Sequence, residues 1–199
     1  MFPEWIEWGW QLTPIPHAAS IWQQHSNIAI QANAHVSMMA DAQWTTSPRQ
    51  TIMVKTADCL PIVVAHKQIP WAAVIHAGWR GLVNDIIPQT LAHAPSHNLC
   101  IWIGPCIHAQ SFIFNDKENL HYFPSDCRYR HQGNTHVDLR LLAKQQLIRA
   151  GVSKSDIYRS LLNTFTMPGL PSYRRNKTRN RLYTWVRINQ QVPAITSMV

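Results

Sequence analysis

Long apolar runs are missing from this sequence of 199 residues. The longest, such as residues 60–65 and 71–75, fall far short of the roughly 20 residues that a membrane-spanning helix needs. The opening segment, "MFPEWIEWGW", has acidic side chains where a secretory signal would carry basic ones, and no apolar segment follows it. We therefore expect no membrane partner and a cytoplasmic location.

Charged side chains are also scarce, at 14% of the residues, and acidic ones are the scarcer kind, with 10 Asp and Glu against 18 Lys and Arg. Hydrophobic residues make up 46% of the chain, which excludes a disordered protein and predicts one globular domain over residues 1–199. The net charge of +8 suits an anionic partner, either nucleic acid or a phosphorylated small molecule. Residues 174–187 carry six of the basic side chains and no acidic one.

Cysteine is sparse too, with four residues in the chain. Without a secretory signal these thiols are expected to be reduced, which leaves them available for metal binding or reaction rather than for a disulfide framework. The four are Cys59, Cys100, Cys106 and Cys127.

Hydrophobic patterning predicts a mixed-sheet α/β or α+β fold. Leu139, Leu142, Ala143, Leu147 and Ile148 form one stripe of a helix within 137–151, which ends at Gly151. A second helix is predicted over residues 81–94, with Pro88 as a kink or early stop. Two helices are too few for a fully parallel sheet. Strands are predicted at residues 28–31, 51–55, 61–65, 71–76, 99–103 and 183–188.

Cys59 and His76 each lie where a predicted strand meets a loop, and Gly78 and Gly81 permit a sharp turn after the histidine. A thiolate and an imidazole are preferred zinc ligands, and an open coordination position would make such a site catalytic. The alternative is a small buried cysteine and a hydrogen-bonded core histidine. The spacing alone favours this alternative, because one Cys and one His at this distance form no general zinc motif.

Several motifs, in order, resemble the YfiH-like family, long known as the polyphenol oxidase or laccase-domain family. They are "WQQHS" (22–26), "TADCLP" (56–61), "AAVIHAGWRG" (72–81), "IGPCI" (103–107), "HVDLRLLAKQQLIRAGV" (136–152) and "SYRR" (172–175). The resemblance covers about residues 22–188. It implies a YfiH-like fold of mixed β-sheets packed by helices, and one zinc held by His25, Cys59 and His76.

The resemblance implies an enzyme that acts on purine nucleosides. The expected reactions are phosphorolysis of adenosine, inosine and methylthioadenosine, and deamination of adenosine, so the partners are a nucleoside and phosphate. A second family activity is an amidase that removes misplaced serine from peptidoglycan precursors. A third reading is a non-catalytic binder of RNA or another anion, although a nucleic-acid partner is not favoured. The older copper assignment finds no support, because the sequence lacks the His-x-His pairs that hold a copper cluster.

Further site residues flank the three expected ligands. Asp58 would act as an acid or base, or would hold a histidine or a backbone donor. Arg80 would bind phosphate or form a salt bridge that fixes its loop. The resemblance places Tyr173, Arg174 and Arg175 at the edge of the site, to hold phosphate or nucleoside, while a solvated basic face is an alternative for this cluster.

The sequence departs from the family pattern at three places. Only 24 residues precede His25, and the Arg-x-Gly-Gly turn of the family's first segment is missing, so a shortened N-terminus is expected. Asn163 stands where the family usually has cysteine, and Asn180 stands where it has glycine. These changes leave the zinc ligands in place and alter the expected shape of the substrate pocket.

Overall fold

The predicted mixed α/β fold is confirmed in a computed structural model of the protein, which describes residues 1–33 and 37–189. A six-stranded sheet runs in the order β10 (Ile157–Arg159), β7 (Leu99–Ile103), β5 (Leu60–His66), β6 (Ala72–Ala77), β3 (Ala42–Thr45) and β2 (Ala29–Gln31). A three-stranded sheet runs in the order β1 (Ile6–Gln11), β11 (Leu182–Ile188) and β4 (Thr51–Thr56). A hairpin pairs β8 (Arg128–His131) with β9 (Asn134–Val137).

Four α-helices and four short 3₁₀ helices lie between the strands of the described chain. The α-helices are α1 (Trp79–Val83), α2 (Ile86–Leu91), α3 (Leu139–Arg149) and α4 (Tyr173–Asn176). The 3₁₀ helices are η1 (Ala109–Ser111), η2 (Leu120–Tyr122), η3 (Ser125–Cys127) and η4 (Lys154–Asp156).

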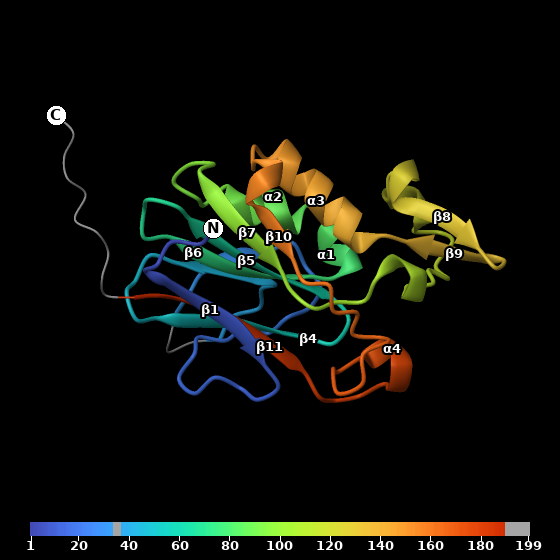
Figure 1. Ribbon diagram of the computed structural model, residues 1–199, viewed down its shortest axis with the longest axis horizontal. Helices are drawn as coiled ribbons and strands as arrows, with labels where there is room; N and C mark the ends of the chain where they lie inside the picture. The colour runs from blue at the N-terminus through green and yellow to red at the C-terminus, as the bar shows by residue number, and fades with distance from the viewer. Residues whose placement is uncertain (34–36, 190–199) are drawn as a thin grey trace.

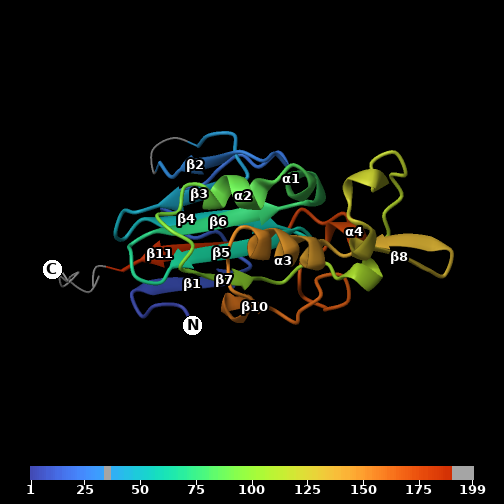
Figure 2. The ribbon, with the colours of Figure 1, turned by 90° about the horizontal axis from the view of Figure 1, so that it is seen from above.

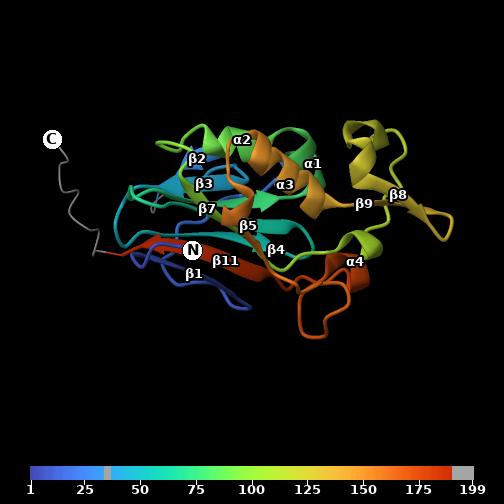
Figure 3. The ribbon, with the colours of Figure 1, turned by 45° about the horizontal axis from the view of Figure 1, so that its top comes forward.

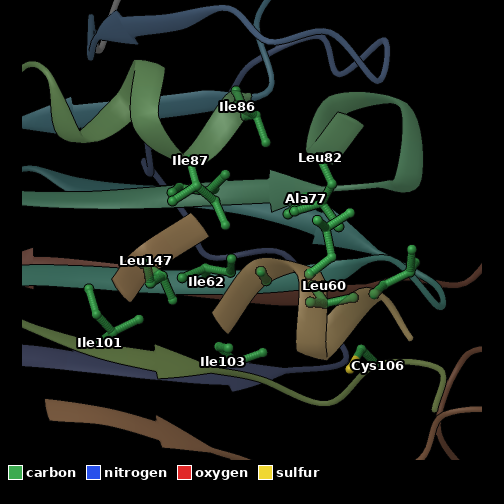
Figure 4. Packing of buried hydrophobic residues seen from close by; sticks show 14 of the residues in the cluster. Leu60, Ile62, Ala77, Leu82, Ile86, Ile87, Ile101, Ile103, Cys106 and Leu147 are labelled. Carbon is green, nitrogen blue, oxygen red and sulfur yellow. The ribbon is translucent and has the colours of Figure 1, made fainter. Parts of the chain in front are cut away.

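The side chains of β5 point alternately to the two faces of the six-stranded sheet, and each face is covered by a different layer. Side chains of a strand point to opposite faces in turn. Leu60 and Ile62 therefore pack toward the helices with residues of α1, α2 and α3 (Figure 4). Val63 and Ala65 pack in a second cluster with β4 and β11 of the three-stranded sheet. Helices α2 and α3 thus cover one face of the large sheet, as Figure 2 shows from above, and the small sheet covers the other (Figure 1).

Six predicted strands are present, whereas the predicted helix over residues 81–94 is divided into α1 and α2. The break lies at Asp85, which has φ +64°, a left-handed conformation that interrupts a helix. Pro88 is neither the kink nor the stop. It occupies the first turn of α2, where its missing N–H removes no helical hydrogen bond.

Helix α3 begins and ends as the sequence indicates. The side chain of Asp138 accepts a hydrogen bond from the backbone N–H of Leu141, 2.9 Å away, and Gly151 has φ +89° after the last turn. The buried stripe differs from the prediction at two positions. Ile148 is half-buried, and Gln146 is buried and donates to the carbonyl oxygen of Leu82 at 2.6 Å, which ties α3 to α1.

The β8–β9 hairpin lies at one end of the molecule, beyond α3 and α4 (Figures 1 and 3). The backbone N–H of Phe114 donates to the carbonyl oxygen of Thr135 in β9 at 2.8 Å. Trp79, Phe112, Phe114 and Phe123 form a cluster of aromatic rings beside this link. Two of these rings, those of Trp79 and Phe112, also line a cavity of about 630 Å³.

Candidate metal centre

Three side chains from distant parts of the chain meet near the end of β6. His25 lies in the loop before β2, Cys59 in the turn between β4 and β5, and His76 in β6. Their candidate ligand atoms all lie within 4.8 Å of one another. Cys59 Sγ is 3.7 Å from His25 Nε2. The fold thus brings together the residues that the family resemblance indicated as zinc ligands.

Two glycines allow the backbone after β6 to approach the His25 loop, and Gly78 also approaches Cys59. A Cβ atom on Gly78 would lie 2.6 Å from His25 Cδ2 and 3.2 Å from Cys59 Sγ. A Cβ atom on Gly81 would lie 2.8 Å from the carbonyl oxygen of Ser26. Gly78 has an ordinary φ of −72°, so glycine is required here for space rather than for a special turn.

Asp41, which the sequence analysis missed, organises two of the three candidate ligands. Its buried carboxylate accepts hydrogen bonds from the backbone N–H groups of Gln24, His25 and Ser26 at 3.1, 3.0 and 2.6 Å. The same carboxylate lies 2.7 Å from His76 Nδ1, which leaves Nε2 of that ring for a metal. His25 has φ +61°, a conformation that non-glycine residues seldom adopt, and the contacts of Asp41 hold it there. A carboxylate bonded to the far nitrogen of a histidine is a frequent partner of zinc-binding histidines.

The charges at the centre favour a thiolate. Burial raises the pKa of Cys59, but the charge of His76 and a hydrogen bond from His25 outweigh it and lower the pKa to about 6. Burial lowers the pKa of His76, but the Cys59 thiolate and the Asp41 carboxylate raise it to about 9. Burial also raises the pKa of Asp41, yet hydrogen bonds from His76 and Ser26 hold it well below its usual range.

The donor set fits zinc in type and spacing. Two imidazole nitrogens and one thiolate are common zinc ligands, and tetrahedral geometry with normal bond lengths places a nitrogen and a sulfur about 3.6 Å apart. The 3.7 Å between Cys59 Sγ and His25 Nε2 agrees with that value. Three protein ligands leave a fourth position open to a substrate or water.

A cavity of about 630 Å³ contains the three candidate ligands in its wall. This volume falls within the range of small-molecule sites. Around the ligands the wall is basic and aromatic: it includes Lys55, Trp79, Arg80, Phe112, Tyr173, Arg174 and Arg181. Gln23 also lines it, and the Gln23 side-chain amide exchanges two hydrogen bonds with the backbone of Lys55, at 2.7 and 2.8 Å, which fastens the His25 loop to β4.

Asp58 lines the cavity, and both of its carboxylate oxygens accept hydrogen bonds. Its Oδ1 accepts a hydrogen bond from the hydroxyl of Thr164 at 2.7 Å, and its Oδ2 accepts one from the backbone N–H of Arg174 at 2.6 Å. Asp58 has φ +94°, in the turn that presents Cys59. These contacts favour the predicted role of holding a backbone donor over the role of acid or base.

Arg80, Tyr173 and Arg174 all line the cavity. The guanidinium of Arg80 lies over the ring of Trp79, 4.3 Å from its centroid, and has no acidic partner among the described residues. Arg174 lies over the ring of Phe112 at 4.9 Å and donates to the carbonyl oxygen of Ile113 at 2.6 Å. Tyr173 is exposed at the first residue of α4.

The structure does not bring Arg175 into this cavity. Its guanidinium donates instead to four carbonyl oxygens in residues 164–170, at 2.6 to 3.3 Å, and so ties that loop together. Arg187 pairs with Glu7 in the three-stranded sheet. Arg175 and Arg187 therefore have local roles in the fold.

Asn163, one of the departures from the family pattern, and Cys106 of the "IGPCI" motif both stabilise the fold. The Asn163 side chain accepts hydrogen bonds from the backbone N–H groups of His108 and Phe165, at 3.3 and 3.1 Å, and donates to the hydroxyl of Ser111 at 3.0 Å. Cys106 is buried in the core beneath the helices (Figure 4). Neither belongs to the His25–Cys59–His76 cluster.

The sequence matches a family model for the multi-copper polyphenol oxidoreductase laccase family over residues 10–189. The chain belongs to this family. Among the described residues of this laccase-domain protein, His25, Cys59 and His76 form the one cluster of three His, Cys, Asp or Glu donors that could share a metal.

Relatives of this laccase-domain protein carry a common name. A Xylella fastidiosa protein named purine nucleoside phosphorylase is 33% identical over 162 residues, which cover 76% of this chain and 62% of that protein. An Aquifex aeolicus protein of the same name is 32% identical over 149 residues, covering 73% of this chain and 69% of the relative. The Escherichia coli relative, purine nucleoside phosphorylase YfiH, is 29% identical and has 65% of its length covered. The chain therefore spans less than two thirds of the Xylella and Escherichia proteins.

Solved structures of the YfiH-like group share the fold. A Neisseria meningitidis protein superposes with a TM-score of 0.79 at 26% identity and covers 86% of this chain and 75% of its own. Bacillus licheniformis YfiH superposes with a TM-score of 0.77 at 19% identity, over 85% of this chain and 74% of its own. In residues 1–33 and 37–189 of the present protein, no helix combines the length and apolar character needed to cross a bilayer.

Proposed function

We propose that this laccase-domain protein is a zinc-dependent purine nucleoside phosphorylase acting on adenosine, inosine and methylthioadenosine, with a second activity in adenosine deamination. The observation that carries the proposal is the cluster of His25, Cys59 and His76 in the wall of a basic, partly aromatic cavity of about 630 Å³. The relatives' shared name supports the choice of reaction.

One zinc ion would be held by His25, Cys59 and His76. When bound, zinc supplies Lewis-acid chemistry to an oxygen of phosphate or water and takes no part in electron transfer. The single cluster of donors among the described residues supports this reading over a multicopper oxidase, which needs several copper sites.

The cationic side chains of the cavity suit phosphate as a co-substrate. Arg80 and Arg174 each lie against an aromatic ring, which orients a planar fork of donors that matches phosphate oxygens. In phosphorolysis a phosphate oxygen forms a bond to C1 of the ribose, the bond from that carbon to the purine nitrogen breaks, and the base leaves with a proton. The fixed positive charge of these side chains would stabilise the bound phosphate anion. It would also stabilise the negative charge that develops as the base leaves.

The purine would occupy the aromatic part of the cavity. Phe112 and Tyr173 both line it, and a flat base gains stacking energy on such rings. In the deamination reaction, water would take the place of phosphate: a water oxygen bonds to C6 of adenosine and ammonia leaves. Asp58 would act in both reactions as a positioning residue, since its carboxylate holds Thr164 and the backbone of Arg174.

Product analysis of the purified, zinc-containing protein tests the proposal. Inosine with phosphate should give hypoxanthine and ribose 1-phosphate, and adenosine without phosphate should give inosine. Cys59→Ser should abolish both reactions. Release of serine from a peptidoglycan precursor without any nucleoside turnover would contradict the proposal. So would tight, strongly salt-dependent RNA binding that His25→Ala leaves unchanged.

A further inference from the structure

A second cavity of about 410 Å³ adjoins the one that contains the candidate metal ligands. The two cavities share four lining residues, Trp79, Arg80, Phe112 and Arg174, and therefore lie side by side. The first cavity already has the volume of a small-molecule site. The second is also lined by residues 113–116, in the segment that leads to the β8–β9 hairpin.

The second cavity carries an excess of positive charge. Arg80, Arg174 and Lys177 line it, against a single carboxylate, that of Asp116. Both oxygens of Asp116 accept hydrogen bonds from Asn119, at 3.2 Å from its backbone N–H and 2.7 Å from its side chain. The acid thus has a partner of its own.

The three cations lack acidic partners among the described residues. Arg80 and Lys177 lie over the rings of Trp79 and Tyr173, 4.3 and 4.6 Å from the centroids, and Arg174 places one N–H on the carbonyl oxygen of Ile113. Their remaining donors are free to meet a ligand. A phosphate ester carries a charge of about −1.5 to −2 at neutral pH and three acceptor oxygens, which matches such a group of donors.

We propose that the second cavity binds a phosphate group. Because the second cavity adjoins the first across Arg80 and Arg174, the structure assigns this phosphate to the ligand itself, a nucleoside that carries a phosphate ester. The inorganic phosphate of the proposed reaction would lie on the other side of these two arginines, toward the candidate metal ligands. The inference rests on the proposed function, since it extends the nucleoside class of ligand. Lys177 is the residue that distinguishes the sites, because it lines the second cavity and does not line the first.

Calorimetric titration of the zinc-containing protein in phosphate-free buffer tests this proposal with inosine, inosine 5′-monophosphate and inorganic phosphate. The monophosphate should bind about tenfold more tightly than inosine, as expected for charge-assisted hydrogen bonds. Lys177→Gln should remove most of that gain, and Lys177→Arg should preserve it. Lys154→Gln, which removes an exposed lysine in η4, should leave it unchanged.

The outcomes distinguish three claims: that the phosphate site exists, that a nucleoside phosphate occupies it, and that the protein acts on nucleosides. Equal binding of inosine and its monophosphate, together with a loss of inorganic phosphate affinity in Lys177→Gln, would retain the phosphate site and assign it to free phosphate. Equal effects of Lys177→Gln and Lys154→Gln on every ligand would overturn the site. If inosine neither binds nor reacts, the proposed function fails, while the phosphate titration still decides whether the site exists.

Discussion

Gly78 sets the spacing of the candidate metal centre at the scale of one residue. Its Cα faces the gap between His25 and Cys59, and an added Cβ would lie 2.6 Å from the imidazole carbon Cδ2. With a Cβ atom at that distance, either the backbone at residue 78 or the imidazole of His25 would have to move. The glycine of the "HAGWRG" motif therefore leaves space for the candidate metal ligands His25 and Cys59.

We predict that Gly78→Ala weakens zinc binding by about 10–100-fold, the range seen when residues that orient metal ligands are changed. Competition with a chromogenic chelator measures this affinity. Gly9→Ala is the matched control, because a Cβ there would meet only ordinary contacts of 3.5 Å with the ring of Trp185. Equal zinc affinity in both variants would contradict the account.

Cys59 should be the reactive thiol of the metal-free protein. The cysteines at positions 100, 106 and 127 are buried, with pKa values raised by burial to about 11 or 12, whereas Cys59 is partly exposed with its pKa lowered to about 6. A lowered pKa means more thiolate at a given pH, and the thiolate is the nucleophile.

Alkylation by iodoacetamide, followed by peptide mass spectrometry, should label Cys59 first, with a half-maximal rate near pH 6. His76→Ala should move that midpoint toward the ordinary value for a thiol, because the charge that stabilises the thiolate is gone. Bound zinc should protect Cys59. Faster labelling of Cys100 than of Cys59 would be incompatible with this account.

The role of Asp41 could not be predicted from the sequence. His25, Cys59 and His76 were found because they lie in recognisable motifs, whereas Asp41 precedes a strand, β3, that the hydrophobic pattern did not predict. Its role depends on three backbone N–H groups of a loop 15 to 17 residues earlier in the chain. No spacing rule connects a carboxylate to donors that only the folded loop presents.

At the scale of elements, Asp41 joins the loop that carries His25 to strand β6. We predict that Asp41→Asn lowers zinc affinity by about 10–100-fold. An amide has one acceptor oxygen in place of two and cannot accept all five of the hydrogen bonds and ion-pair contacts that the carboxylate makes.

The same chelator competition measures this loss, with Asp156→Asn as control. Asp156 pairs with Lys67 at 2.6 Å, away from the metal cavity, so its change should leave zinc affinity unaltered. An Asp41→Asn protein that keeps wild-type zinc affinity would show that the loop and β6 hold the ligands without this link.

Strands β5 and β6 were easier to predict than the helix boundaries of this chain. The buried runs of β5 and β6 are continuous and apolar, so their pattern survives without tertiary information. The break between α1 and α2 was not predicted, because it depends on the left-handed conformation of Asp85, a residue that also occurs within helices. Strands β8 and β10 were missed for a related reason: most of their side chains are exposed, so no apolar alternation marks them.

At the scale of the whole molecule, Asp58 links the turn after β4 to the C-terminal segment that lines the cavity. Its contacts reach Thr164 and Arg174, more than 100 residues later in the chain. This link and the guanidinium of Arg175, which holds residues 164–170, fix one wall of the cavity relative to the candidate metal ligands.

We predict that Asp58→Asn lowers the melting temperature by several degrees and raises KM for nucleosides, while zinc content stays the same. Loss of a charge-assisted hydrogen bond costs about 1.5–3 kcal/mol, and each kcal/mol shifts the melting temperature by about 2–4 °C for a chain of this size. Calorimetry and steady-state kinetics check these values. A variant with unchanged stability and KM but with kcat abolished would instead identify Asp58 as an acid or base.

Metal analysis of the full chain decides whether His25, Cys59 and His76 bind one zinc ion. The protein should be purified without chelator and without added metal, and its metals measured by inductively coupled plasma mass spectrometry. We expect about one zinc per chain, with little copper, and loss of that zinc in Cys59→Ser but not in Cys100→Ser. Zinc well below one per chain, or zinc unchanged after Cys59→Ser, would contradict it.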